Sequence, residues 1–176
     1  MFDKLLDFII NFIEDILPFF VIKEYEGAVV LRFGKYYKTY EKGFYWKIPF
    51  VDNPMKDFIT TTTLTIPSQS ITTLDEKQLV VKAVVKYNIE DIKAFLLEVY
   101  DSKDAIADTT QAIIKEQVTT RKWEDCNNLK LDNDITIKLR REVKKWGIYI
   151  DKVTLTDIGI IKSIRLFNET EVINNG

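Results

Sequence analysis

Few residues in this sequence are candidates for a catalytic role. The 176-residue chain contains no histidine, so it lacks the commonest general base near neutral pH and the commonest zinc ligand. Its one cysteine, Cys126, cannot form an internal disulfide and is compatible with a reducing compartment, and we interpret it as a partly buried, inert thiol. Neither a GxGxxG nor a GxxxxGK(S/T) phosphate-binding motif occurs. The sequence therefore predicts no metal site and no cofactor.

Acidic residues are the remaining candidates for acid–base catalysis. They are mostly interleaved with lysines, as in Asp101-Ser102-Lys103-Asp104, which is the pattern of a solvated surface. No serine, cysteine or lysine has a recognisable base as a partner. The formal net charge of −2 and the scattered basic residues provide no positive field for nucleic acid. These observations predict a protein that is not an enzyme and does not bind nucleic acid.

Residues 2–22, FDKLLDFIINFIEDILPFFVI, carry the strongest chemical signal, which is the capacity to bury apolar surface. On a helical wheel with about 100° per residue, the polar residues fall within an arc of roughly 120°. The remaining arc is apolar and wider than one contact with a soluble core normally uses. Burying ten of these side chains is worth on the order of 15–30 kcal/mol, so the helix needs an apolar partner. The predicted membrane-binding residues are Phe2, Leu5, Leu6, Phe8, Ile9, Ile10, Phe12, Ile13, Ile16, Leu17, Phe19 and Phe20.

Three partners are compatible with this helix: a bilayer, another copy of the chain, or the rest of the fold. A membrane-spanning helix is disfavoured, because it needs about 20 predominantly apolar residues and this stretch contains four acids and a lysine. A secretory signal is also disfavoured, since the segment lacks a basic start and a small-residue cleavage site. A helix lying in one leaflet fits best, with binding driven by apolar area because the polar face is acidic. The alternative is a helix buried in a protein interface.

Hydrophobic periodicity predicts the elements that follow this helix. Strands are predicted at 28–33, 44–49, 58–66, 79–87 and 148–158, and the first two are expected to form a hairpin-like pair. Helices are predicted at 91–99, from Asp101 or Ser102 to about Arg121, and from a cap among residues 132–134 to Gly147. The order of strands, helices and a final strand predicts an α+β fold in one compact domain. The inward faces of the two longer helices are predicted to carry Ile106, Ile113, Ile114 and Val118 in the first and Ile135, Leu139, Val143 and Trp146 in the second.

Two motifs in the first half of the chain are similar to those of a known family. Residues 21–35, VIKEYEGAVVLRFGK, and residues 41–52, EKGFYWKIPFVD, resemble the opening of the stomatin, prohibitin, flotillin and HflK/C domain, which is called SPFH or Band 7. The spacing of FGK, a glycine and IPFVD makes this resemblance fairly specific. Further similarity begins at Thr73-Leu74-Asp75 and extends the match over roughly residues 21–160.

The resemblance implies an antiparallel sheet packed with helices and preceded by an N-terminal membrane segment. Residues 1–20 would be an amphipathic membrane-associating helix that ends or kinks at Pro18, with Phe19 and Phe20 at the interface. Residues 21–160 would form the SPFH/Band 7 domain, and residues 161–176 a short C-terminal tail. The family usually continues into a long coiled coil, and this chain ends about where that would begin, so we expect a stand-alone domain that lacks it.

In function, the resemblance implies a non-enzymatic scaffold of the stomatin and prohibitin type. Members assemble into rings, cages or microdomain scaffolds on membranes and regulate proteases, channels or lipid organisation. We therefore expect a homo-oligomer that binds the lipid of one membrane leaflet and faces a reducing compartment on the cytoplasmic side. A membrane protease or a channel is a candidate partner. The alternative is a soluble oligomeric adaptor whose N-terminal helix packs in a protein interface.

Overall fold

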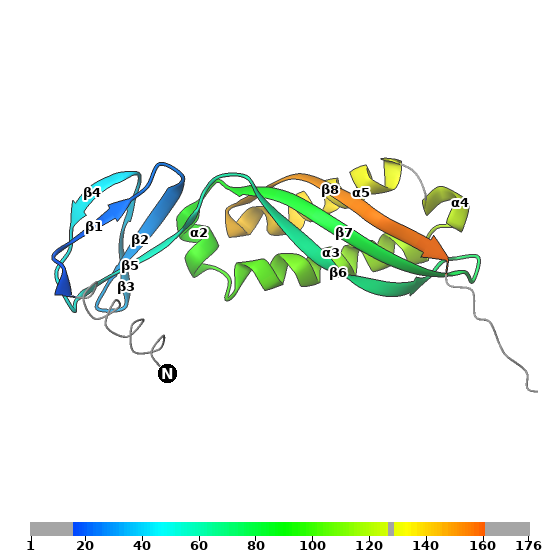
Figure 1. Ribbon diagram of the computed structural model, residues 1–176. Helices are drawn as coiled ribbons and strands as arrows, with labels where there is room; N and C mark the ends of the chain where they lie inside the picture. Colours follow the sequence, from blue (N-terminus) through cyan, green and yellow to red (C-terminus); the bar gives the residue numbers. More distant parts are fainter. Residues whose placement is uncertain (1–15, 127–128, 161–176) are drawn as a thin grey trace, which may run out of the picture.

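The computed structural model describes residues 16–126 and 129–160 and shows an elongated fold with two parts (Figure 1). The N-terminal part holds five short strands, and the C-terminal part holds a three-stranded sheet with helices packed along it. This arrangement confirms the predicted α+β class with antiparallel pairing and helical packing. The predicted tail, residues 161–176, and most of the predicted amphipathic helix lie outside the described residues.

The N-terminal part is a small all-β unit with its own core. Strand β2 (Glu26–Arg32) pairs antiparallel with β3 (Lys35–Tyr40) on one side and with β5 (Asp52–Phe58) on the other. Strands β1 (Phe19–Ile22) and β4 (Gly43–Trp46) form a separate two-stranded ribbon. The core of this part is made by Phe20, Ile22, Ala28 and Val30, with Tyr40 and Tyr45 packed against them.

The pairing of these strands corrects one prediction. The sequence predicts that residues 28–33 pair with residues 44–49, but β2 pairs with β3 and β5, and β4 pairs with β1. Phe33 and Gly34 have φ angles of 51° and 74°, which closes a two-residue hairpin turn and returns the chain at once into β3. Strand β3 is absent from the prediction because its tyrosines and lysines are exposed or half-exposed on both faces and show no alternation.

The C-terminal part is built on a twisted antiparallel sheet with the strand order β6-β7-β8 (Figure 1). Its strands are β6 (Thr62–Thr72), β7 (Gln78–Ile89) and β8 (Ile148–Ile160). Alternate residues of β7 are buried, so the sheet has one dry face. The strands predicted at 79–87 and 148–158 are confirmed. The run predicted at 58–66 is divided, because Phe58 ends β5 and β6 begins at Thr62.

Aspartate side chains cap two of the helices, and the second of these caps, Asp101, was predicted from the sequence. Helix α2 (Ile92–Leu97) begins after Asp91, whose Oδ1 accepts hydrogen bonds from two backbone N–H groups of the first turn at 2.9 and 3.1 Å. Helix α3 (Ser102–Thr119) begins after Asp101, whose Oδ1 accepts from the Asp104 N–H at 3.3 Å. The buried residues of α3 include all four that were predicted to face inward: Ile106, Ile113, Ile114 and Val118.

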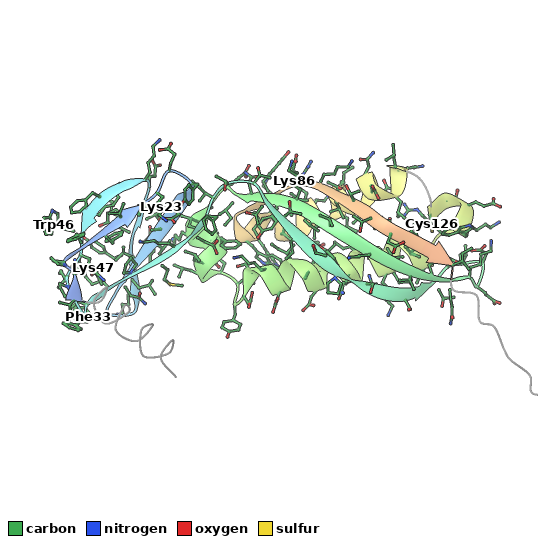
Figure 2. All side chains as sticks on the ribbon, viewed as in Figure 1. Lys23, Phe33, Trp46, Lys47, Lys86 and Cys126 are labelled. Carbon is green, nitrogen blue, oxygen red and sulfur yellow. The ribbon has the colours of Figure 1, made fainter. Side chains whose placement is uncertain are left out.

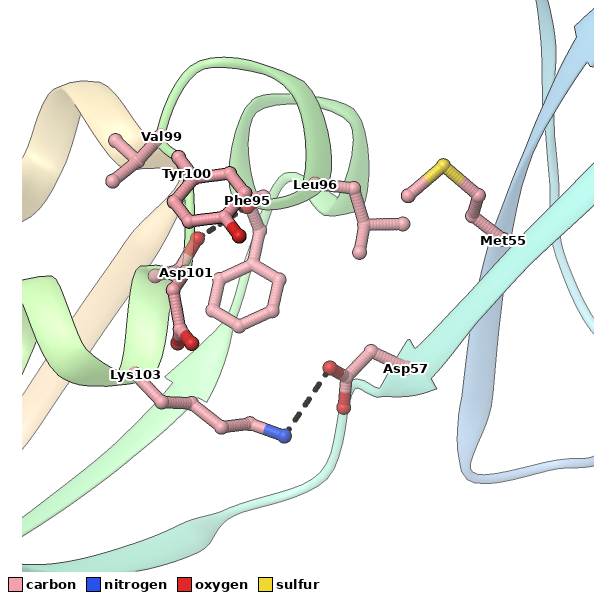
Figure 3. A pocket seen from close by; sticks show the side chains of 9 residues that line it. Met55, Asp57, Phe95, Leu96, Val99, Tyr100, Asp101 and Lys103 are labelled. Carbon is pink, nitrogen blue, oxygen red and sulfur yellow. Dashed lines mark hydrogen bonds and ion pairs between the residues drawn. The ribbon is translucent and has the colours of Figure 1, made fainter.

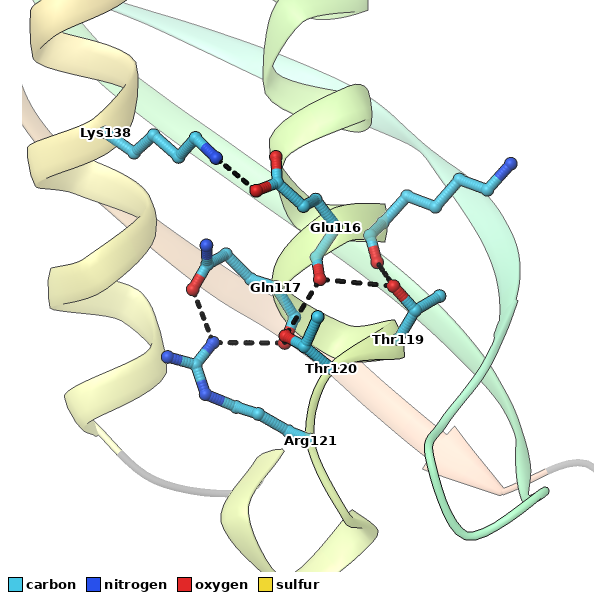
Figure 4. Close-up of polar contacts among 7 residues, drawn as sticks. Glu116, Gln117, Thr119, Thr120, Arg121 and Lys138 are labelled. Carbon is cyan, nitrogen blue, oxygen red and sulfur yellow. Dashed lines mark hydrogen bonds and ion pairs between the residues drawn. The ribbon is translucent and has the colours of Figure 1, made fainter.

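Three further helical elements complete the C-terminal part. These are α4 (Trp123–Cys126), α5 (Leu129–Val143) and the 3-10 helix η1 (Lys144–Trp146). Gly147 ends η1 in the left-handed conformation with a φ of 72°, as its position in the sequence predicts. Lys138 of α5 pairs with Glu116 of α3, which ties the two long helices together (Figure 4).

The start of α5 corrects a second prediction. Asp132 was expected to belong to the N-terminal cap, but the helix begins at Leu129 and places Asp132 inside its first turn. There the carboxylate is buried and accepts a hydrogen bond from the Leu155 N–H of β8 at 3.3 Å. Tertiary contact with the sheet therefore uses a side chain that local sequence assigns to a cap.

Helix α5 continues this contact along the outer edge of β8. Four residues after Asp132, the Thr136 hydroxyl accepts from the Val153 N–H at 2.9 Å. Four residues further on, Arg140 donates to the Ile150 carbonyl at 2.6 and 2.9 Å. Positions four residues apart share one helix face, so one face of α5 occupies the strand edge with which another chain would otherwise pair.

Asp132→Asn tests the cost of burying this carboxylate. Burial raises the pKa of Asp132 above its ordinary value, so the folded protein binds its proton more tightly than the unfolded chain does. The aspartate therefore destabilises the fold progressively as the pH rises above about 4, whereas asparagine does not titrate. We expect the stability of the variant, relative to the original protein, to increase between about pH 4 and about pH 7 in urea unfolding. A relative stability that stays constant over this range would contradict the expectation.

The two parts of the molecule meet through α2. A Cβ atom on Gly27 of β2 would lie 3.3 Å from the Ile92 side chain, so glycine permits α2 to approach the small sheet closely. Val29 of β2 belongs to the core of the larger part. At the same junction a cavity of about 310 Å³ is bordered by Asp57 of β5 and Lys103 of α3, whose charged groups lie 3.4 Å apart (Figure 3). These contacts hold the small part at one end of the molecule.

Candidate membrane-binding surface

The outward face of the β1–β4 ribbon is aromatic. Successive side chains of a strand point to opposite faces, and Phe20 and Tyr45 turn into the small core while Phe19, Phe44 and Trp46 lie on the other face. The ring of Phe19 lies 5.1 Å from that of Phe44 and 6.4 Å from that of Trp46, measured between centroids. The outer face of an antiparallel ribbon is normally polar. A contiguous group of rings on this face therefore marks an interaction surface.

Two turns beside this ribbon present further aromatic rings. Phe33 lies in the β2–β3 turn and Phe50 in the β4–β5 connection, and they are 79% and 78% exposed. Both have positive φ angles, 51° and 62°, which bulky side chains rarely adopt. The Phe33 N–H donates to the Val51 carbonyl at 3.1 Å, so the two turns lie side by side. Trp46, which is 71% exposed, lies at the same end of the molecule as Phe33 (Figure 2). We call this group the aromatic tip: Phe19, Phe33, Phe44, Trp46 and Phe50.

A buried carboxylate shapes the turns of the aromatic tip. Asp52 accepts hydrogen bonds from Arg32 Nε at 2.7 Å and Arg32 Nη2 at 3.0 Å, and its Oδ2 also accepts from the Ile48 N–H at 2.9 Å. The Asp52 N–H donates to the Ile48 carbonyl at 2.9 Å and closes the loop that carries Phe50. The Arg32 guanidinium lies over the Tyr37 ring, 3.8 Å from its centroid. Paired, multidentate contacts of this kind hold the backbone of the exposed turns in one geometry.

The same contacts set the charge state of Asp52. Hydrogen bonding to Arg32 holds the pKa of the Asp52 carboxyl below its ordinary value, and the Ile48 N–H and the charge of Lys47 act in the same direction. A depressed pKa in the folded state means that the carboxylate stabilises the fold above about pH 4 and loses this contribution as the pH falls through the folded value. The support of the aromatic tip is therefore intact throughout the neutral range.

Four of the predicted membrane-binding residues lie in the described part of the chain. Ile16 is exposed, and Leu17 and Phe19 are half-buried. Phe20 is 7% exposed, and its ring packs against two tyrosine rings of the small core. The alternation of β1 explains the difference, because Phe19 and Phe20 point to opposite faces of the ribbon. The other predicted residues lie outside the described ranges: Phe2, Leu5, Leu6, Phe8, Ile9, Ile10, Phe12 and Ile13.

The structure also adds residues that the sequence prediction omitted. Phe33, Phe44, Trp46 and Phe50 are all exposed, and none belongs to the N-terminal amphipathic segment. A local signal exists for two of them, because Phe33 directly precedes a glycine and Phe50 directly follows a proline, at turn positions that usually carry polar residues. Their assembly into one surface with the ribbon depends on strand pairing, which the sequence does not display.

Other kinds of site have little support in the described part of the chain. Within residues 16–126 and 129–160, no group of three or more His, Cys, Asp or Glu side chains is placed to hold a metal ion. Cys126 is buried, and burial raises the pKa of its thiol, which keeps it protonated near neutral pH. No helix in these ranges is long and apolar enough to cross a membrane. The aromatic tip is therefore the feature with the clearest functional signal.

Comparison with known proteins agrees with the resemblance read from the sequence. The SPFH domain / Band 7 family matches residues 20–166. An uncharacterized protein of Methanocaldococcus jannaschii is 29% identical over 140 residues, which cover 78% of this chain and 70% of that protein. Stomatin-like protein 3 of Homo sapiens is 28% identical over 80% of this chain, and protein HflK of Haemophilus influenzae is 29% identical over 55% of it. These matches span only 50% and 24% of the human and bacterial relatives. Since the family match covers most of the sequence and both parts of the fold, the chain belongs to the SPFH domain / Band 7 family.

Proposed function

We propose that this protein is a non-enzymatic, membrane-associated scaffold that binds one leaflet and self-assembles there to organise or regulate membrane proteins. The observation that carries this proposal is the aromatic tip, which lies at the end of the small part and directly follows the N-terminal segment. Exposed aromatic rings favour the interface between water and lipid, where they bury apolar surface without leaving the polar headgroups.

The magnitude of this contact suits reversible binding. Burying an apolar side chain contributes about 1.5–3 kcal/mol, so Phe33, Trp46 and Phe50 together would contribute roughly 4.5 kcal/mol at the lower end of this range. That energy alone is too small for stable attachment, and the predicted amphipathic helix would supply a second apolar contact. Two membrane contacts in one chain bind more tightly than either does alone.

The proposal also includes self-assembly and the regulation of a partner protein, in keeping with the general behaviour of the family. Confinement to one leaflet raises the local concentration of the chains and so favours contacts between copies. We propose a homo-oligomer that faces a reducing compartment on the cytoplasmic side, in keeping with its single buried thiol. A membrane protease or a channel is the proposed partner class.

Flotation with vesicles tests the membrane half of the proposal. Ile9→Glu with Ile13→Glu places two charges on the predicted apolar face, and we expect affinity for vesicles to fall by at least about 100-fold, because burying even one charge costs about 3 kcal/mol. Lys4→Gln with Asn11→Glu is the matched control, since it lowers the net charge by the same amount on the polar face. The control should float as the original protein does, and both variants should keep the same thermal midpoint.

Two outcomes would count against the proposal. Original protein that stays in the soluble fraction with vesicles present would exclude membrane binding. The soluble adaptor would be favoured instead if the protein is an oligomer in the absence of vesicles and deletion of residues 1–15 reduces it to a monomer. The deletion should end before Phe19, because β1 is part of the small fold and its loss would confuse unfolding with dissociation.

A further inference from the structure

A lysine occupies an inward-facing position at the end of the β1–β4 ribbon. Tyr45 points into the small core, Trp46 points outward, and Lys47 turns inward again, with its N–H donating to the Pro18 carbonyl at 2.8 Å. Lys47 is only 9% exposed. Lysine side chains are rarely buried to this extent, because the charged end normally extends into open solvent. The position therefore calls for a specific explanation.

Lys47 makes no side-chain hydrogen bond or ion pair with any residue in the described ranges. The carboxylate beside it, Asp52, is already engaged by the Arg32 guanidinium and the Ile48 N–H. Among the described residues, every fully buried side-chain nitrogen or oxygen has a hydrogen-bond partner. The Lys47 ammonium has none, so it is not fully buried and remains accessible to solvent. Instead, Lys47 lines a cavity of about 430 Å³, which is within the usual range for small-molecule sites.

A second lysine borders the same cavity. Lys56 of β5 donates from Nζ to the Val21 carbonyl at 2.8 Å, and this ammonium lies 5.9 Å from the centroid of the Phe20 ring. An ammonium group has three N–H donors, so two remain for a ligand. The cavity is thus bordered by two lysines, one just after β4 and one in β5, and its other lining residues are apolar: Leu17, Phe19, Phe20, Val21 and Pro54.

We propose that this cavity binds the phosphate group of an anionic phospholipid, with Lys47 and Lys56 as the cationic contacts and the apolar wall against the glycerol and upper acyl chain. A phosphodiester supplies a hydrogen-bonded anionic partner, which Lys47 does not have among the described residues, and lysine binds phosphate well as a point charge. The apolar wall distinguishes a lipid from free phosphate, which has no apolar portion to bury. The position also fits, because Phe19 belongs both to the cavity wall and to the aromatic tip.

Charge distribution supports this choice of ligand. Residues 16–58 contain seven lysines and arginines and five aspartates and glutamates, a net charge of +2, whereas the whole chain has −2. The acidic face of the predicted N-terminal helix would repel an anionic surface. A phosphate site in the small part therefore supplies the electrostatic attraction that the helix lacks. This inference rests on the proposed membrane function.

Vesicle cosedimentation tests the site with Lys47→Gln combined with Lys56→Gln. The matched control is Lys35→Gln with Lys38→Gln, which removes the same charge from exposed positions on β3 of the same small part. The original protein should bind vesicles of phosphatidylcholine, and more tightly when phosphatidylglycerol is added. We expect the cavity variant to lose this gain, by roughly fivefold for each lysine, while its binding to phosphatidylcholine alone is unchanged. The control should keep most of the gain.

A soluble assay separates this site from the proposed function. Short-chain phosphatidylglycerol below its micelle concentration should raise the thermal midpoint of the original protein but not that of Lys47→Gln, and inorganic phosphate should have much less effect. If the original protein binds no vesicles yet shows this stabilisation, the membrane proposal fails and the site stands. A cavity variant that keeps its gain on anionic vesicles, or a control that loses it equally, would overturn the site. Equal stabilisation by inorganic phosphate would overturn the assignment to lipid.

Discussion

Replacing the three most exposed rings of the aromatic tip should lower affinity for phosphatidylcholine vesicles by roughly 1,000-fold or more, since each ring contributes about 1.5 kcal/mol at the lower end of the range for a buried apolar side chain. The substitutions are Phe33→Asn, Trp46→Thr and Phe50→Asn. Asparagine tolerates positive φ far better than phenylalanine does, and both turn positions have positive φ, so the fold should be preserved or slightly stabilised. Threonine suits the strand position. Cosedimentation measures binding, and thermal unfolding reports the fold.

The control for this prediction removes apolar surface elsewhere. Leu74, Tyr100 and Leu129 are exposed to a similar degree but lie outside the small part of the fold. Their simultaneous replacement by serine should leave vesicle affinity within about twofold of the original, because these side chains do not reach the membrane with the tip. Equal loss of binding in both triple variants would show that general surface hydrophobicity, and not this surface, drives association.

Gly147→Ala should be the most destabilising single substitution among the described glycines, with a cost of roughly 3–5 kcal/mol. Gly147 has a φ of 72°, and a Cβ there would lie 2.3 Å from the Asp91 carbonyl oxygen and 2.9 Å from the Asp91 Cβ. The Gly147 carbonyl also accepts from the Glu90 and Asp91 N–H groups at 2.9 and 3.1 Å. The added methyl group would push the start of α2 away from this junction. A fall in thermal midpoint of about 10–15 °C is expected for a protein of this size.

Two other glycines separate the causes of this effect. Gly34 has nearly the same φ, 74°, but nothing lies within 4 Å of a Cβ built on it, so Gly34→Ala should cost only about 1 kcal/mol. Gly159 has open space and no positive φ, and its replacement should be close to neutral. If Gly147→Ala is no more destabilising than Gly34→Ala, the backbone conformation alone explains the cost, and the contact with Asp91 is not tight.

Periodicity predicts those elements that bury one regular face. Helix α3 and strand β7 each pack a single face on the large core, so their spacings of 3.6 and 2 residues are visible in the sequence. Strands β3 and β5 are absent from the prediction because β3 is exposed on both faces and β5 is mostly polar and contains Pro54. Their positions follow from pairing with β2, a contact between segments that are separate in sequence.

The candidate site likewise has one part that local sequence predicts and one part that depends on contacts between distant segments. The apolar side chains of residues 2–17 share one helical face, and that pattern is local. Phe33 and Phe50 become neighbours only through the hydrogen bond between their turns, and Phe20 is buried in the small core because the ribbon turns it inward. Lys47 likewise has an ordinary local sequence, and its burial depends on which way the ribbon faces.

The sequence by itself determined the family, the α+β class, the helix cap at Asp101 and the amphipathic N-terminal segment, because each depends on residues close together in the chain. The tertiary structure decided which aromatic side chains point outward, which lysine is buried beside a cavity, and that Asp132 binds a strand instead of capping a helix. Burial is a relation between segments that are distant in sequence, and a change of one residue in strand register exchanges the two faces. Local sequence patterns specify neither the contacts between distant segments nor the register of the strands.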